Sequence, residues 1–184
     1  WCRGRRAVLL NYWRFDGDCE NLGNPATWGR LREVIEAPVP YHGDDGRDYR
    51  IQLTLVDAGY LTDTVYRFCE RYSAAVFPVR GRVAPEKSKQ GDIKEFWSQP
   101  IEHTGMIGWA ASVDMYKDRW SSSLRRSWDG LGMQPEGYFN APIDSTDEQL
   151  KELTVETRRE KIDKLTQRRL GFEWHRPSGA NNEL

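Results

Sequence analysis

One short apolar run that ends in a single carboxylate constrains this chain more than any other feature. Residues 51–60 read I-Q-L-T-L-V-D-A-G-Y, so strand-forming residues lead directly to Asp57. An apolar run of this kind is expected for a strand buried inside a sheet. A carboxylate at the point where a buried strand leaves the sheet is costly to desolvate unless a cation compensates its charge. Asp57 is therefore a candidate for binding a cationic ligand.

The residues after Asp57 predict a tight turn followed by a helix. Ala58 and Gly59 have almost no side chain, which lets a ligand or another backbone segment come close. Thr62 is suited to cap a helix, and apolar residues then recur on one face at positions 65, 68, 69 and 72. Open α/β sheets bind their ligands at the carboxyl ends of strands, ahead of a helix. The residues leave open a second interpretation, in which Asp57 only caps the helix or stabilises the turn.

The rest of the chain alternates between strand and helix patterns, which predicts an α/β fold. Strands are expected over residues 5–15, 75–79, 106–113 and 138–141, and helices over 25–37, from Asp114 and over 145–156. Ser145 and Glu148 have the spacing of a capping box for the last of these helices. The strand–helix–strand order over residues 51–79 predicts a parallel unit with a right-handed crossover. Residues 82–100 are polar and predict a long loop.

Composition narrows the function classes without choosing one. The chain has 184 residues and a formal net charge of -1, so it has no global excess of basic residues. A local basic face is still enough to bind phosphate. No apolar segment approaches the roughly 20 residues that a membrane span needs, and no signal peptide is visible. We therefore expect no contact with a membrane and no secretion.

The cysteines and histidines do not form a recognisable ligand set. The three cysteines, Cys2, Cys19 and Cys69, are odd in number and widely spaced. This pattern predicts reduced thiols in a cytosol-like compartment rather than a disulfide framework or a zinc site. The three histidines, at positions 42, 103 and 175, are far apart in the sequence, so we expect them on the surface or in packing.

Residues 157–177 are strongly basic and end in the alternating stretch G-F-E-W-H-R, which predicts a β-ribbon. The cations of this segment are Arg158, Arg159, Lys161, Lys164, Arg168 and Arg169. They are suited to follow a phosphate backbone, because each one that neutralises a phosphate releases a counterion. The alternative is a solvated face whose charge is balanced by Glu152, Glu156, Glu160 and Asp163.

Seven segments of the chain, taken in order, resemble the nuclease domain of the large terminase subunits of tailed bacteriophages, in particular the lambda-like group. These segments are V-D-A-G-Y, T-V-Y-R-F-C, V-F-P-V-R-G, V-D-M-Y-K-D-R-W, Y-F-N-A-P, E-L-T-V-E and F-E-W-H-R-P-S-G-A-N-N-E-L. Each segment alone is a weak signal, but all seven occur in the family's order across most of the chain.

The resemblance implies a ribonuclease H-like fold, in which a mixed central sheet is flanked by helices and gathers acidic residues at its centre. It also implies cleavage of DNA phosphodiesters with two divalent ions, Mg²⁺ or Mn²⁺, since these hard cations prefer carboxylate oxygens. Two such ions, about 4 Å apart, activate the attacking water and stabilise the leaving oxygen. On this interpretation Asp57 is a catalytic residue and a metal ligand on the family's second strand.

The resemblance further implies that residues 1–184 form a single nuclease domain fragment. The family's first catalytic strand and its closing helix, with their acids, are expected outside this chain. The fragment would then carry one of three core metal-binding acids and would cut DNA poorly on its own. Glu183 lies next to the expected position of the last acid and is a second catalytic candidate, with a capping or surface role as the alternative.

Six basic residues are candidate DNA contacts. Arg80 and Lys117 are expected to contact phosphate, with ordinary ion pairing as the alternative. The other four candidates lie in the basic segment and are Arg158, Arg159, Arg168 and Arg169.

The function implied is the nuclease part of a viral DNA-packaging motor, which cuts concatemeric double-stranded DNA into genome units in the host cytoplasm. Its implied partners are double-stranded DNA, the small terminase subunit and the portal of the procapsid. Two alternatives stay open. One is a noncatalytic module that docks DNA or the portal, and the other is a ribonuclease H-like nuclease of the resolvase or transposase type.

Overall fold

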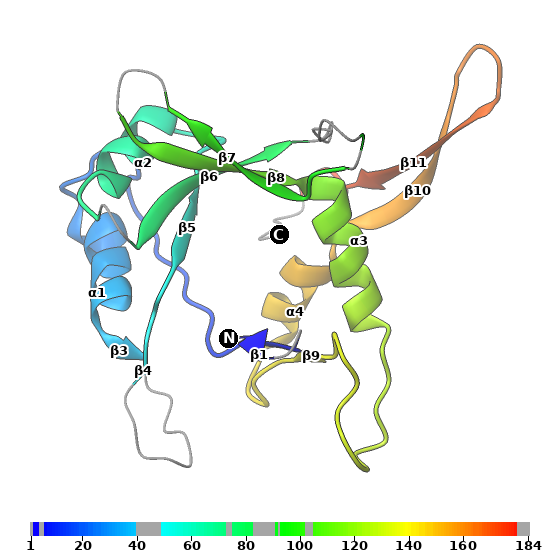
Figure 1. Cartoon of the computed structure of the whole chain (residues 1–184), viewed down its shortest axis with the longest axis horizontal. Coiled ribbons are helices and arrows are strands. Elements are labelled where there is room, and N and C mark those ends of the chain that lie inside the picture. Colours follow the sequence, from blue (N-terminus) through cyan, green and yellow to red (C-terminus); the bar gives the residue numbers. More distant parts are fainter. Residues whose placement is uncertain are drawn as a thin grey trace. The chain divides into compact units, whose positions relative to one another are not determined.

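The computed structural model describes residues 2–3, 6–39, 49–72, 75–82, 91, 93–101 and 105–179. The chain divides into two compact units (Figure 1). The first unit comprises Trp1–Tyr12 and Asp114–Leu184, and the second comprises Trp13–Val113. Each unit is described separately below.

The second unit is built on a mixed four-stranded sheet. Its strands, in their order across the sheet, are β5 (Thr54–Asp57), β6 (Val76–Arg82), β8 (Ile107–Ser112) and β7 (Phe96–Pro100). Strands β5, β6 and β8 run parallel, and β7 pairs antiparallel with β8. The predicted α/β class with a mixed sheet and packed helices is confirmed, and this arrangement is consistent with the ribonuclease H-like type.

The helices of this unit begin where their sequence signals lie. A π-helical turn, η1 (Pro25–Gly29), leads into α1 (Arg30–Glu36), and the Asn24 side chain accepts a hydrogen bond from the Ala26 N–H at its start. Helix α2 (Thr62–Cys69) connects β5 to β6, so the predicted parallel strand–helix–strand unit is present. Thr62 does not cap α2 as predicted, because its hydroxyl donates to the Ala58 carbonyl from inside the first turn. A small ribbon of β3 (Pro38–Val39) and β4 (Tyr49–Arg50) follows α1.

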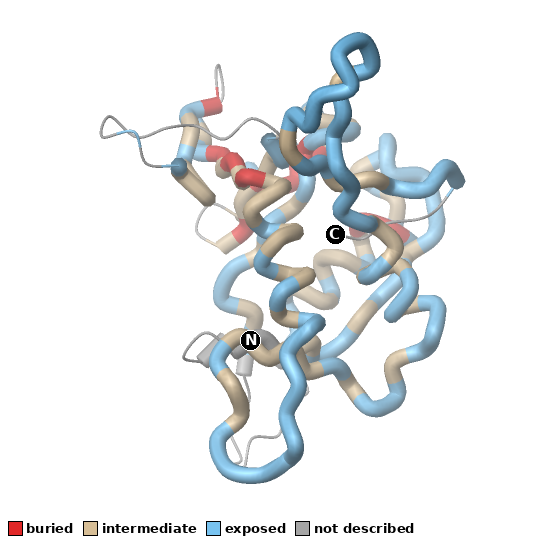
Figure 2. Tube along the Cα trace, turned by 90° about the vertical axis from the view of Figure 1, so that its right-hand side faces the viewer, coloured by how far each residue is buried: buried red, intermediate tan, exposed pale blue. Residues whose placement is uncertain are grey.

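The core of the second unit forms where α2 packs on the sheet. Phe68 is 1% exposed, and its ring centroid lies 4.7 Å from that of Trp28 and 5.4 Å from that of Tyr72. The Trp28 indole N–H donates to the Cys19 carbonyl, which satisfies the one polar atom of this large side chain. The buried residues lie in a few short segments of the described chain, and most of the backbone is intermediate or exposed (Figure 2).

Strand β5 is less buried than its sequence predicts. Within the described residues it lies at one edge of the four-stranded sheet, and its burial alternates from residue to residue. Leu53 is 56% exposed and Leu55 is 41% exposed, whereas Val56 packs against the core. A continuous apolar run is expected for a strand that is covered on both faces. Among the described residues, β5 is covered only on the face toward α2, and with Leu55 exposed the prediction of a fully buried strand is wrong.

Within the described residues, the first unit contains a three-stranded sheet, a two-stranded ribbon and two helices. A three-stranded sheet joins β1 (Cys2–Arg3), β2 (Arg6–Val8) and β9 (Phe139–Asn140), in that order. Helix α3 (Val113–Leu124), which starts one residue before this unit, and α4 (Asp147–Thr154) accompany a two-stranded ribbon of β10 (Thr157–Ile162) and β11 (Arg169–His175). The predicted β-ribbon of the basic segment is confirmed.

One aromatic side chain joins three elements of the first unit. The Trp120 ring of α3 packs edge-on against Phe139 of β9, with 4.5 Å between the centroids. Its indole N–H donates to the Leu153 carbonyl of α4 at 2.8 Å. Helix α4 has a capping box, but it is formed by Thr146 and Gln149, one residue later than the predicted pair.

Two other elements differ from the sequence prediction. Of the predicted strand over residues 5–15, the structure describes a strand only over Arg6–Val8, because Arg6 and Ala7 pair with β1 and Ala7 and Val8 pair with β9. The predicted loop over residues 82–100 contains β7, whose five residues F-W-S-Q-P follow a long polar stretch and end in Pro, so their strand signal is weak. Pairing with β8 supplies the hydrogen bonds that make it a strand. Among the described residues, no helix combines the length and apolar character that crossing a bilayer would demand.

The two cysteines with described side chains differ sharply in environment. Neither is in a disulfide; Cys19 is exposed and Cys69 is buried in the core beside Phe68. Burial penalises the thiolate and raises the pKa of Cys69 to about 11. The reduced thiols predicted from the sequence agree with these two positions.

We expect Cys69 to resist thiol reagents in the folded protein while Cys19 reacts readily, since the thiolate is the reactive form. Mass-spectrometric mapping of iodoacetamide labelling at pH 8, before and after unfolding in urea, measures both rates in one sample. Because the pKa of Cys69 is raised on folding, its contribution to stability is complete below pH 9.0 and is lost as the pH rises toward about 11. Equal labelling of both thiols in the native protein would contradict the core assignment.

Candidate functional site

Asp57 ends β5 at the carboxyl edge of the parallel strands, as predicted. It lies opposite Val79 of β6 in the parallel ladder, and the next N–H, of Ala58, donates to the Val79 carbonyl at 2.8 Å. The Asp57 side chain is exposed, and its Oδ1 accepts a hydrogen bond from the Gly59 N–H at 2.9 Å. A Cβ at Gly59 would lie 3.2 Å from that oxygen, so a larger residue would crowd the carboxylate.

In this geometry Asp57 stabilises the turn, which is the alternative role that the sequence left open. The turn uses Oδ1, and within the described residues Oδ2 accepts no hydrogen bond. A carboxylate can accept through both oxygens, so a role in the turn leaves the second oxygen available to a cation. The hydrogen bond from Gly59 fixes the orientation of the carboxylate and makes the two roles compatible.

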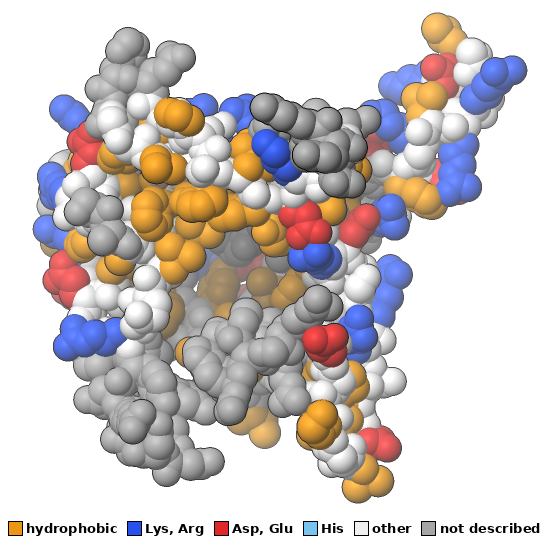
Figure 3. Space-filling model, in the orientation of Figure 1, with side chains coloured by type: hydrophobic (Ala, Val, Ile, Leu, Met, Phe, Trp, Pro, Cys, Tyr) orange, Lys and Arg blue, Asp and Glu red, His pale blue; other side chains and the backbone are white. Residues whose placement is uncertain are grey.

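Asp57 projects from the face of the sheet that does not carry α2. Side chains alternate along a strand, and Val56 packs into the α2 core, so Leu55 and Asp57 lie on the other face. Register places Phe77, Val79 and Trp109 on that same face. The Trp109 ring stacks on Phe96 at 4.7 Å and meets Phe77 edge-on at 6.4 Å. Asp57 thus stands at the end of an aromatic face that Figure 3 shows as a band of hydrophobic side chains.

Arg80 is close to Asp57 in the sheet but points the opposite way. It follows Val79 in β6, so its side chain projects toward α2. There its Nη2 donates to the Thr62 hydroxyl at 2.8 Å, and its guanidinium lies 5.7 Å from the Tyr66 ring centroid. The Nε is buried and has no hydrogen-bond partner within the described part of the chain. The sheet therefore separates Arg80 from Asp57, and phosphate contact by Arg80 stays a prediction.

Lys117 is held in a largely buried ion pair. Its ammonium pairs with the Glu156 carboxylate, and the two side chains are only 14% and 7% exposed. The pair connects α3 to the residue just before β10, which is the ordinary ion-pairing role given as the alternative to DNA contact. The ammonium reaches a phosphate only if this pair opens, and contact with DNA by Lys117 stays a prediction of the sequence alone.

The four predicted DNA-binding arginines of the basic segment all lie on the β10–β11 ribbon or its turn. Arg158, Arg159 and Arg169 are exposed along the strands, and Arg168 is exposed in the turn. Two of the acids expected to balance this segment are engaged elsewhere, since Glu156 pairs with Lys117 and Glu152 accepts from the Tyr12 hydroxyl. The remaining two, Glu160 and Asp163, lie within the ribbon itself.

The neighbour of Lys117 is a residue that the sequence analysis did not single out. Asp118 Oδ1 accepts from the Trp174 indole N–H at 3.1 Å, and its Oδ2 lies 3.3 Å from Arg158 Nη2. Asp118 thereby fixes the base of the ribbon on α3. The one sequence signal for Asp118 was its position in the stretch V-D-M-Y-K-D-R-W. Its partner Trp174 lies 56 residues away in the sequence, so that stretch alone does not predict the contact.

No complete metal site exists within the described residues. Among them, no three His, Cys, Asp or Glu side chains come together in an arrangement that could hold a metal ion. Asp57 offers hard oxygen donors of the kind that Mg²⁺ and Mn²⁺ prefer, but it is a single carboxylate. The oxygen donors of Asp57 suit such an ion, but one carboxylate supplies too few ligands to complete its coordination. Glu183, His42 and His103 lie outside the described residues.

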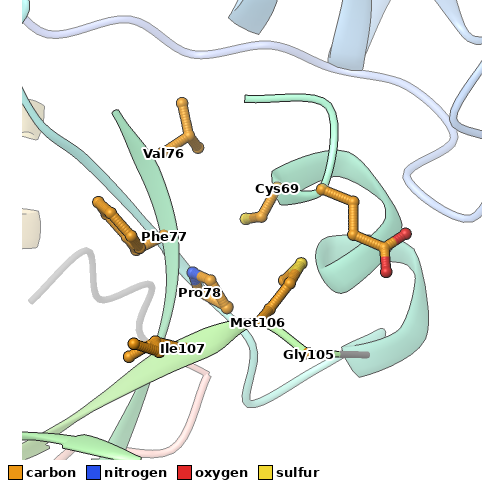
Figure 4. A pocket seen from close by; sticks show the side chains of 8 residues that line it. Cys69, Val76, Phe77, Pro78, Gly105, Met106 and Ile107 are labelled. Atoms are coloured by element: carbon orange, nitrogen blue, oxygen red, sulfur yellow. The ribbon is translucent and has the colours of Figure 1, made fainter. Parts of the chain in front are cut away.

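An apolar pocket in the second unit lies at the other end of the strands. It has a volume of about 390 Å³ and is lined by Cys69, Val76, Pro78 and Met106, among others (Figure 4). Val76 begins β6 and Met106 directly precedes β8, so the pocket is at the amino ends of strands whose carboxyl ends lie beside Asp57. The lining residues that the structure describes include no cation that could hold a phosphate.

Comparison with models of known protein families identifies the family of this chain. The model of one family, described as terminase large subunit gpA, endonuclease domain, matches residues 1–184. The chain belongs to this family. No curated protein and no solved structure matches the chain. The resemblance inferred from seven short segments is thereby confirmed, and the chain is an endonuclease domain of the DNA-packaging terminase type.

The buried pair that anchors this terminase domain's ribbon gives a direct test. We expect Glu156→Gln to lower the free energy of unfolding by about 3–5 kcal/mol, because it leaves the Lys117 ammonium buried without its counter-charge. Urea denaturation followed by tryptophan fluorescence measures the change. Replacing both partners with apolar residues, Lys117→Met and Glu156→Leu, should restore much of the loss.

The matched control is the exposed pair of Arg30 and Glu33, whose side chains are 62% and 65% exposed. Glu33→Gln should change the free energy of unfolding by no more than about 1 kcal/mol, since solvent screens this pair. If Glu156→Gln behaved like Glu33→Gln, the assignment of a buried, mutually dependent pair would be wrong.

Proposed function

We propose that this domain cuts concatemeric double-stranded DNA into genome units during viral packaging, in a reaction that depends on divalent metal ions. The family match over the whole chain supports an endonuclease of the terminase type. The single observation that carries the site assignment is the oriented Asp57 carboxylate at the carboxyl end of β5, with Oδ1 held by Gly59 and Oδ2 without a hydrogen bond from any described residue.

The role proposed for Asp57 is to hold one divalent ion through Oδ2. Mg²⁺ or Mn²⁺, when bound, would activate water and stabilise the leaving oxygen of the scissile phosphodiester. Asp57 would hold the ion, and the hydrogen bond from Gly59 keeps the carboxylate from rotating away. Gly59 also keeps the space beside the carboxylate clear for a phosphate. Further oxygen ligands, Glu183 among the candidates, would come from outside the described residues.

The cations of the β10–β11 ribbon are proposed to hold the DNA. Arg158, Arg159, Arg168 and Arg169 are exposed and lie on one continuous ribbon, which supports phosphate contact. The small terminase subunit and the portal of the procapsid are proposed as protein partners, and the host cytoplasm as the place of action. The free thiols of Cys19 and Cys69 agree with that compartment.

A noncatalytic docking module remains the competing proposal, and one observation favours it. Asp57 stands as a single exposed carboxylate among the described residues, and such an acid serves a turn without any metal. A resolvase or transposase has no comparable support, since the family that matches is a terminase family.

The substitution Asp57→Asn in the complete large terminase subunit distinguishes a metal-dependent nuclease from a noncatalytic docking module. We expect cutting of supercoiled plasmid in Mg²⁺ to fall by at least about 100-fold, because loss of a metal ligand forfeits several kcal/mol of transition-state stabilisation. Binding of a duplex oligonucleotide in EDTA should change by less than about twofold, since Asp57 repels rather than holds phosphate.

Asp63→Asn is the matched control, because Asp63 is an exposed acid in the first turn of α2, only six residues away. It should cut like the unaltered protein. Undiminished cutting by Asp57→Asn would remove Asp57 from the metal site and leave the docking module as the better account.

A further inference from the structure

The β10–β11 ribbon projects from the first unit and touches it mainly at its base. Trp174 and Arg158, which lie opposite each other near the open end of the ribbon, both bind Asp118 of α3. Every residue of β10 is exposed, and Figure 3 shows Lys and Arg side chains along the ribbon. The ribbon has no core of its own to bury, so its exposed side chains need another explanation.

The turn at the far end of the ribbon is held rigidly by one side chain. Asp163 Oδ1 accepts hydrogen bonds from the N–H groups of Leu165 and Thr166, at 2.9 and 2.7 Å. The Thr166 N–H lowers the pKa of Asp163, so the carboxylate is ionised at neutral pH and keeps both bonds. The Gln167 N–H closes the turn on the Asp163 carbonyl, with a left-handed φ of 55° at Gln167.

This rigid turn presents a single aliphatic side chain to solvent. Leu165 is 95% exposed at the tip, although Leu is a residue whose burial is normally favourable. The Asp163 hydrogen bonds hold the backbone on either side of Leu165, so the side chain cannot fold back without breaking them. A cation stands at each end of this tip, Lys164 before Leu165 and Arg168 in the turn just before β11.

The cations of the ribbon lie on both of its faces. Arg158 and Arg169 stack on the same Phe172 ring, 4.5 and 4.4 Å from its centroid, so they share one face. Arg159 alternates to the other face, opposite Glu173, together with Lys161. A ribbon that lay flat on an acidic surface would need cations on one face only. Cations on both faces suit a slot with negative charge along both walls.

The excess of positive charge on the ribbon favours a polyanion as its ligand. Residues 157–175 contain six Lys and Arg against three Asp and Glu, although the whole chain has a net charge of -1. Arg159, Lys164 and Arg168 have no acidic partner within the described part of the chain. The major groove of DNA, about 12 Å wide and lined by phosphates on both sides, admits a two-stranded β-ribbon.

We propose that the β10–β11 ribbon enters the major groove of double-stranded DNA, where Leu165 packs against the C5-methyl groups of thymine and Lys164 and Arg168 contact the flanking phosphates. The thymine methyl is the apolar group that base edges display in this groove. The inference rests on the proposed function only in taking DNA as the ligand. It does not depend on Asp57, and it assigns the ribbon a preference for thymine at the contacted base pairs.

The test measures binding of the complete large terminase subunit to duplex oligonucleotides in EDTA, so that no cutting occurs. One duplex contains thymine, and a second of the same sequence contains uracil, which lacks the methyl group. We expect the unaltered protein to bind the uracil duplex about fourfold more weakly, the effect of about one buried methyl group. Leu165→Ala should bind both duplexes equally, at the weaker value.

Leu131→Ala is the matched control, because Leu131 is also an aliphatic side chain of the first unit and is 77% exposed. It should keep the full preference for thymine. Lys164→Ala and Arg168→Ala should weaken binding to both duplexes alike, and each should reduce the slope of log affinity against log salt concentration by about one. Lys151→Ala, an exposed lysine of α4, should leave that slope unchanged.

Two outcomes would overturn the proposal. If the preference for thymine were absent, or persisted in Leu165→Ala, the tip would not read the major groove. Competition by a minor-groove ligand such as netropsin would then place the tip in the minor groove. If the lysine and arginine variants left DNA affinity and its salt slope unchanged, the ribbon faces an acidic protein surface instead. Because no result requires cleavage, loss of the metal-site assignment of Asp57 would appear separately, as normal cutting by Asp57→Asn.

Discussion

Burial of α2 against β5 and β6 is the constraint on which the site depends. Phe68, Val65 and Cys69 fill the space between the helix and the sheet, and this packing fixes where β5 ends. The parallel ladder with β6 then sets Asp57 opposite Val79, and side-chain alternation turns its carboxylate to the face away from α2. Loosening that core would shift the turn through Gly59 and, with it, the orientation of the one acid that the described sheet offers.

The two units divide the properties that a DNA-cutting domain needs. The second unit holds the oriented carboxylate on a rigid sheet, and the first unit holds a cationic ribbon with a rigid tip. The ribbon owes its rigidity to local contacts, the Asp163 turn and the Phe172 stack, and its attachment to Asp118. The ion pair of Lys117 and Glu156 explains why the lysine of the stretch V-D-M-Y-K-D-R-W is largely buried.

Much of this fold is readable from the sequence because its signals are local. The parallel β5–α2–β6 unit, strand β8, helix α4 and the basic ribbon all follow from periodicity and turn residues within single stretches. The exposure of Leu55, the opposite directions of Asp57 and Arg80, and the anchor at Asp118 depend on pairing between distant segments. Strand β7 was missed for the same reason, since its strand character comes from β8 and not from F-W-S-Q-P. Family membership followed from the order of seven weak segments, which no single motif could have shown.

The central claim is that the Asp57 carboxylate gathers a divalent ion at the end of β5, and iron-directed cleavage of the backbone tests it most directly. The complete large subunit would be loaded with Fe²⁺ in place of Mg²⁺ and treated with ascorbate and peroxide, and the cut sites mapped by mass spectrometry. The account predicts cuts in the turn between β5 and α2 that Mg²⁺ suppresses and that Asp57→Asn abolishes. Cuts confined to other segments, or unchanged in Asp57→Asn, would contradict it.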